Sequence, residues 1–97
     1  MKFNVTRAKE NILALARKLG YRPLSKTEEE FTCVRFLASS EYPRFHLYIK
    51  ENKDELLFNL HLDQKKPTYA GSKAHSGEYT GAAVEREAER IKKILES

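Results

Sequence analysis

The sequence predicts an α+β domain of α-β-β-β-α order: a two-layer sandwich in which a three-stranded antiparallel sheet carries both helices on one face. Three observations lead to this fold class. Two segments, one near each end of the chain, repeat apolar residues at helical spacing. Three central segments are β-like, and two of them alternate strictly between apolar and polar residues. The links between these three are short, which favours hairpins. With 97 residues in all, we expect a single domain over residues 1–97.

The first helix is expected over residues 6–19. Its apolar residues recur at spacings of three and four, as Ile12, Leu15, Ala16 and Leu19. Asn4 or Thr6 can cap its start, since short polar side chains accept hydrogen bonds from the first turn. Gly20 stands where a left-handed C-cap is favoured. The helix should therefore end at residue 19.

Three strands are expected next, over residues 31–38, 44–51 and 55–63. In the second and third strands, apolar side chains occupy every other position and so share one face. A turn on Asn52 and Lys53 sets the register between them. The resulting pairs are Ile49 with Leu56, Leu47 with Phe58 and Phe45 with Leu60. Every pair then joins two apolar side chains, as a buried face requires.

The last helix is expected to begin after Gly81, with Thr80 as its cap. Its apolar stripe consists of Val84, Ala88, Ile91 and Leu95. The resulting α-β-β-β-α order is similar to that of double-stranded-RNA-binding domains, which dock two helices on one face of a three-stranded sheet. The resemblance covers topology alone. That family has a lysine-rich start to its last helix, whereas Glu85 and Glu87 stand there in this chain.

Residues 64–81 form a long connection without predicted secondary structure. Connections of this length are often functional. The segment contains three glycines, Gly71, Gly77 and Gly81, together with side chains that can stack, hydrogen-bond or carry positive charge. Its two tyrosines indicate that it packs onto something, because disordered linkers are poor in aromatic residues. The plain alternative is a loop that only covers the open sheet face.

The sheet face away from the helices is predicted to be polar and open. We expect it to present Arg35, Arg44, His46, Tyr48, Asn59, His61 and Asp63, with Cys33, Leu37 and Leu57 among them. The net charge of +4 mildly favours a polyanionic partner. The sequence therefore predicts a small module that binds nucleic acid or another phosphate-bearing ligand. The candidate residues are Arg35, Arg44, His46, Tyr48, Lys65, Lys66, Tyr69, Lys73 and Tyr79. The alternative is a solvated polar face.

A metal site is the second hypothesis. His61 and Asp63 are two residues apart on one strand and so point to the same face. His75 and Glu78 follow in the long connection, and four such ligands could hold a divalent zinc, manganese or iron ion. This would make the chain a metal-binding protein or a metal-dependent enzyme. The alternative is that His61 hydrogen-bonds across the strand and Asp63 ends it.

Other function classes have less support. The longest apolar run, residues 12–16, is far shorter than a membrane span, and the N-terminus lacks the apolar core of a signal peptide. A single cysteine, Cys33, forbids an internal disulfide and fits a cytoplasmic protein. A nucleophilic Cys33 near His46 or Arg35 is disfavoured, since strand cysteines are mostly structural. Leu37 and Leu57 could mark a protein-interaction surface. We expect a binding module rather than an enzyme.

Overall fold

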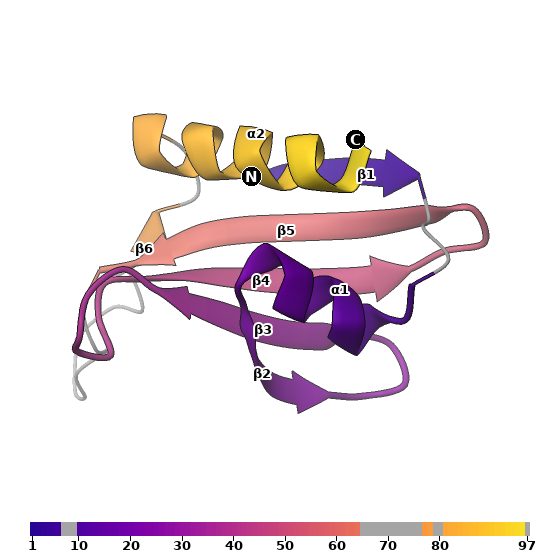
Figure 1. The fold of residues 1–97 in the computed structure, drawn as a ribbon, viewed down its shortest axis with the longest axis horizontal. Coiled ribbons are helices and arrows are strands. Elements are labelled where there is room, and N and C mark those ends of the chain that lie inside the picture. The colour runs from indigo at the N-terminus through magenta and orange to yellow at the C-terminus, as the bar shows by residue number, and fades with distance from the viewer. Residues whose placement is uncertain (7–9, 65–76, 79–80, 97) are drawn as a thin grey trace.

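Figure 1 shows the computed structural model, which describes residues 1–6, 10–64, 77–78 and 81–96. Two helices accompany an antiparallel sheet in which five strands follow the order β1-β5-β4-β3-β2, and a short sixth strand, β6, pairs with β5. The elements are β1 (Lys2–Thr6), α1 (Ile12–Leu19), β2 (Arg22–Lys26), β3 (Phe31–Phe36), β4 (Arg44–Glu51), β5 (Glu55–Asp63), β6 (Gly77–Glu78) and α2 (Ala82–Glu96).

The α+β class is confirmed, and the prediction of a three-stranded sheet is wrong. One strand precedes α1 and another follows it, so the order is not α-β-β-β-α. The topological similarity to double-stranded-RNA-binding domains is therefore lost. The added strand β2 is exposed along its whole length and contains Pro23, which a sheet tolerates at its edge.

The helix α1 begins at Ile12 and not at residue 6, because Thr6 belongs to β1 and Asn11 is the cap. The side chain of Asn11, and not that of Asn4 or Thr6, caps the helix by accepting a 2.8 Å hydrogen bond from the backbone of Ala14. Its end is as predicted, since Gly20 has φ +88° and a left-handed conformation. The second helix begins directly after residue 81 as expected, whereas the predicted cap Thr80 lies outside the described residues.

The boundaries of β4 and β5 match the predicted ones, but their register differs by two residues. The backbone N–H of Asn52 donates to the carbonyl of Glu55 at 2.9 Å, so the turn centres on Lys53 and Asp54. The observed pairs are Ile49 with Phe58, Leu47 with Leu60 and Phe45 with Leu62. A shift of two residues keeps each side chain on its predicted face, so the apolar face is preserved although the partners change.

One hydrophobic cluster forms the core. It takes buried side chains from α1 (Ile12, Leu15, Ala16, Leu19), from α2 (Val84, Ala88, Ile91) and from the alternate positions of β4 (Phe45, Leu47, Ile49). In Figure 1, α2 runs alongside β1, with which it makes contact. The intervening positions of β4 point to the opposite face of the sheet, which carries the candidate site.

Candidate metal centre

Two histidines from neighbouring strands meet on the sheet face opposite the core. In the register of β4 and β5, His46 lies directly across from His61, and Arg44 lies across from Asp63. Cross-strand partners in an antiparallel pair share a face and have closely spaced Cβ atoms. The two cross-strand pairs are also adjacent along the strands. The register therefore gathers two imidazoles, a carboxylate and a guanidinium at one end of β5.

Asp63 is the centre of this group. Nε2 of His61 lies 2.8 Å from Oδ1 of Asp63, and Nδ1 of His46 lies 3.3 Å from Oδ2. Nε of Arg44 donates to Oδ2 of Asp63 at 3.1 Å. The carboxylate thus contacts both histidines, while the guanidinium compensates its charge.

Ring contacts hold the histidines in place. The ring of Tyr48 stacks on His46 with centroids 4.5 Å apart and an interplanar angle of 21°. The rings of His46 and His61 lie 4.8 Å apart, and those of Tyr48 and His61 lie 5.6 Å apart. Arg44 lies over the ring of Tyr42, 4.6 Å from its centroid. Such packing restricts the side-chain torsions and fixes where the ring nitrogens point.

Burial keeps both imidazoles neutral. His61 is 5 % exposed, and the side chain of His46 is 15 % exposed. Burial lowers the pKa of His61 below its usual value of 6.5. Burial, followed by the neighbouring His61, likewise lowers the pKa of His46. Both rings are therefore in the form that binds metals at pH 7.

The donor atoms are close enough to share one ion. One ligand atom from each of His46, His61 and Asp63 can be chosen so that all three lie within 4.8 Å of one another. Ligands around a tetrahedral zinc ion, with bonds near 2.0 Å, lie roughly 3.3 Å apart, so the side chains would have to close in by about 1 Å to hold zinc. Of the two ring nitrogens of His46, Nδ1 faces Asp63, whereas Nε2 is buried and has no hydrogen-bond partner within the described part of the chain. Two imidazoles and a carboxylate suit zinc, iron or manganese.

The structure brings together part of the predicted ligand set. His61 and Asp63 are side by side, as their spacing predicted. His46, expected only as a general ligand-binding residue, joins them as a third donor. His75 lies outside the described residues, and of Glu78 only the backbone is described, where it pairs with Leu62. The strand register, once known, is the signal that identifies His46.

The predicted polyanion surface is only partly assembled. Arg44, His46 and Tyr48 share the polar face, as expected. Five other candidates fall outside the described residues: Lys65, Lys66, Tyr69, Lys73 and Tyr79.

Cys33 and Arg35, expected on the polar face, lie on the core face instead, because they pair with Leu47 and Phe45. Leu37, also expected there, lines a hollow with Arg35 and Phe45. Both faces of β3 are apolar, with Cys33 and Val34 fully buried, so alternation could not orient this strand. Burial raises the pKa of the Cys33 thiol to about 12, and its Sγ contacts the carbonyl of Leu47 at 3.7 Å. A nucleophilic Cys33 is therefore not supported.

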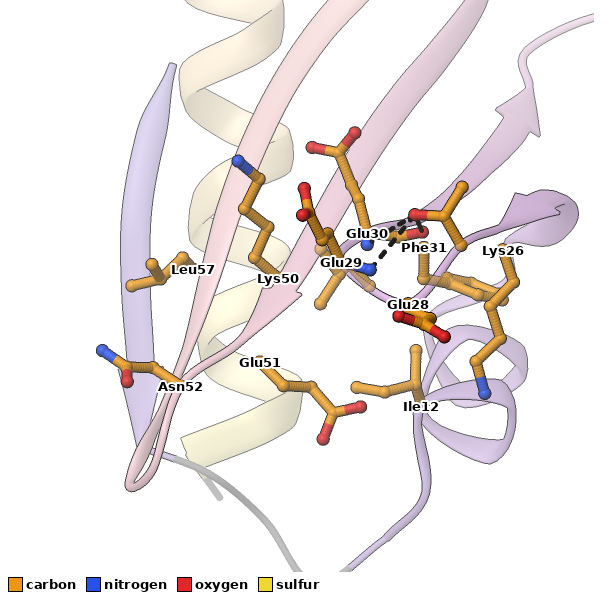
Figure 2. Close-up of a pocket in the computed structure, with 12 residues that line it drawn as sticks. Ile12, Lys26, Glu28, Glu29, Glu30, Phe31, Lys50, Glu51, Asn52 and Leu57 are labelled. Carbon is orange, nitrogen blue, oxygen red and sulfur yellow. Dashed lines mark hydrogen bonds between the residues drawn. The ribbon is translucent and has the colours of Figure 1, made fainter.

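A separate hollow of about 440 Å³ lies where the β2–β3 and β4–β5 turns approach each other. Figure 2 shows the carboxylates of Glu28, Glu29 and Glu51 around it, with Ile12 on its wall. Backbone N–H groups of Glu29 and Glu30 donate to the Thr27 hydroxyl at 3.2 and 3.0 Å. These bonds shape the turn between β2 and β3.

Neither helix is long and apolar enough to cross a membrane, within the residues that the structure describes. Comparisons with protein-family models, with curated proteins and with solved structures gave no match.

Proposed function

We propose that this chain is a metal-binding domain that holds a divalent transition metal ion, with zinc as the first candidate, between His46, His61 and Asp63. The observation that carries the proposal is the convergence of two imidazoles, that of His61 buried and that of His46 partly buried, with a carboxylate within 4.8 Å. Neighbouring strands supply these groups, so the sheet fixes their relative positions before any ion arrives. Ligands ordered in advance lower the entropic cost of binding.

Each neighbouring group has a distinct part in this proposal. Nε2 of His61 and Nδ1 of His46 face the carboxylate, so a metal ion there replaces the proton shared between ring and carboxylate. Arg44 keeps its hydrogen bond to Oδ2 and orients Asp63 from outside the ligand shell. Tyr48 packs against both rings and limits the access of water. Three protein ligands leave a fourth position for a further protein group or a water molecule.

Binding of nucleic acid or another polyanion on the same face stays a prediction. Polyanion binding requires that both helices cover the core face, so that the face with His46 stays open. It also requires cationic side chains on that open face that are available to phosphates. Of its predicted cations, Arg35 is bonded to Glu87 on the core side and Arg44 to Asp63. Arg35 therefore lies on the opposite face of the sheet and Arg44 is engaged by Asp63, so neither supports phosphate binding on the face that carries His46. A cytoplasmic location likewise remains our prediction, supported by the buried free thiol of Cys33.

The test is direct titration of the chelator-treated full chain with Zn²⁺ by calorimetry, and with Co²⁺ by visible absorption. We expect one ion per chain and intense tetrahedral Co²⁺ bands. His46→Gln and His61→Gln should each weaken Zn²⁺ binding by roughly 100-fold. Asp63→Asn should act in the same direction, and the hairpin variant Asp54→Asn is its matched control. Circular dichroism confirms that each variant is folded.

Two conditions separate metal binding from polyanion binding. Zn²⁺ affinity should vary little with salt, whereas phosphate contacts weaken steeply as salt rises. Affinity should also hold steady down to pH 6.5 and decline further below, because the histidine pKa values are lowered. Equal affinity in wild type and His46→Gln would show that the ion binds elsewhere. Loss of binding in His75→Gln would instead add His75 as the fourth ligand.

A further inference from the structure

A buried carboxylate on the core side of the sheet organises two arginines. Glu87 of α2 is 3 % exposed. Arg35 donates to it through Nε at 3.0 Å and Nη2 at 2.8 Å, and Arg90 through Nε and Nη2, both at 2.8 Å. The hydroxyl of Tyr21 donates a further bond at 2.6 Å. One side chain of α2 therefore fixes groups from β3, from its own next turn and from the segment after α1.

The guanidinium groups outnumber the carboxylate that holds them. Arg35 and Arg90 share the single charge of Glu87, so one positive charge is left over. Arg86, one turn before Arg90 on α2, is exposed and adds a second. The positions are also fixed, because Nη2 of Arg90 donates to the carbonyl of Leu19 at 2.6 Å and Arg35 lies over the Phe45 ring. Excess positive charge in a fixed arrangement favours an anion.

These arginines surround a hollow of about 320 Å³. Its lining consists of Arg35, Leu37, Phe45, Ala83, Arg86, Glu87 and Arg90. The volume is at the lower end for ligand pockets, so it suits one small group. One side is apolar, since Leu37 is 43 % exposed and Ala83 is half-buried. The acidic residues Glu85 and Glu89 line a neighbouring hollow, which shares Arg86 and Arg90 with this one and also contains Lys93.

We propose that this hollow binds a phosphate monoester, with the phosphate on the arginines and the apolar group of the ester on Leu37. Guanidinium groups match the oxygen geometry of phosphate and bind it through paired, charge-assisted hydrogen bonds. Nε and Nη2 of Arg35 and Arg90 donate to Glu87, which leaves Nη1 of Arg35 and the exposed guanidinium of Arg86 to bond the phosphate. Arg90, which also bonds Leu19 and Tyr21, contributes charge. The site lies on the other face of the sheet from His46 and is independent of the proposed metal.

The experiment is an NMR titration of the full ¹⁵N-labelled chain with phenyl phosphate, inorganic phosphate and phenol at constant ionic strength. We expect saturable shifts at Leu37, Ala83 and Arg86 with phenyl phosphate, weaker binding of inorganic phosphate, and no matching shifts with phenol. Arg86→Gln should weaken phenyl phosphate binding by roughly tenfold, because one charged contact is lost. Within the described residues, Glu87 is bonded by Arg35, Arg90 and Tyr21 and not by Arg86, so this variant should keep the fold.

The matched control is Arg17→Gln, which removes an exposed arginine from the other helix. Equal weakening by Arg17→Gln and Arg86→Gln would show diffuse charge attraction and overturn the site. Leu37→Ser should remove the preference for phenyl phosphate over inorganic phosphate while leaving inorganic phosphate binding unchanged. Absence of saturable shifts at Leu37, Ala83 and Arg86 would also overturn the proposal.

Discussion

Replacing Glu87 by Gln should destabilise the fold substantially, because Gln resembles the protonated acid in shape and lacks its charge. Burial alone would raise the pKa of Glu87, but hydrogen bonds from Arg90, Arg35 and Tyr21 outweigh it and hold the pKa at about 2, compared with 4.5 for the free group. This difference corresponds to about 3 kcal/mol in the free energy of unfolding at neutral pH. The Glu87→Gln variant should lose about that amount.

The same reasoning fixes how this difference varies with pH. A carboxyl group with a lowered folded-state pKa stabilises the protein above its unfolded pKa, and the contribution is lost as pH falls through the folded value. The gap between wild type and Glu87→Gln should be constant above pH 5.5 and fall to about 1 kcal/mol at pH 3. Urea denaturation at pH 7, 5 and 3, followed by circular dichroism, measures the gap directly.

Glu89→Gln on the same helix is the control. Glu89 is 69 % exposed and lies 3.9 Å from Lys92, so its loss should cost no more than about 0.5 kcal/mol at any of these pH values. A Glu87→Gln gap that stays the same between pH 7 and pH 3 would refute the reasoning. So would a gap as small as that of Glu89→Gln.

Two further predictions concern single positions. Cys33, buried and with a thiol pKa raised to about 12, should not react with a disulfide reagent at pH 8 unless denaturant is present; reaction of the native protein at the rate of a free thiol would contradict its position. Gly20→Ala should lower the free energy of unfolding by about 1–2 kcal/mol, because the φ of +88° at this position is strained for alanine. A steric clash does not contribute, since the added Cβ would lie at an ordinary 3.6 Å from Cδ of Arg35. Gly20→Asn should cost less in the same denaturation assay, since Asn tolerates this conformation, and equal losses would argue against backbone strain.

The sequence predicted the strands in which the apolar–polar alternation repeats several times. It did not predict strands in which this alternation is short or in which both faces are alike. β4 has apolar residues at every other position from Phe45 to Ile49, and β5 from Leu56 to Leu62, so their boundaries were correct. β1 contributes only Phe3 and Val5 to the core, and β2 is exposed throughout, so neither gave a usable period. The end of α1 at Gly20 was predictable because it requires only the left-handed backbone conformation that glycine favours.

The candidate site depended on register, which a local pattern does not determine. In the predicted register His46 would have faced Asn59; a shift of two residues places it against His61. Both registers bury the same side chains, so hydrophobicity does not distinguish them. Glu87, by contrast, left a visible signal. It follows Val84 by three residues and so falls on the buried stripe of α2, where an acidic residue requires a partner.

The pairing of β5 with two short strands also bears on how readily the sheet could be extended by a strand of another molecule. A nine-residue strand with an open edge would offer its backbone groups to a strand of another molecule. Here β1 covers one end of β5 and β6 the other, and α2 packs beside β1. At the far side of the sheet, β2 carries Pro23 and a register irregularity before Ser25. Both borders are thus short or interrupted, which makes them poor templates for aggregation.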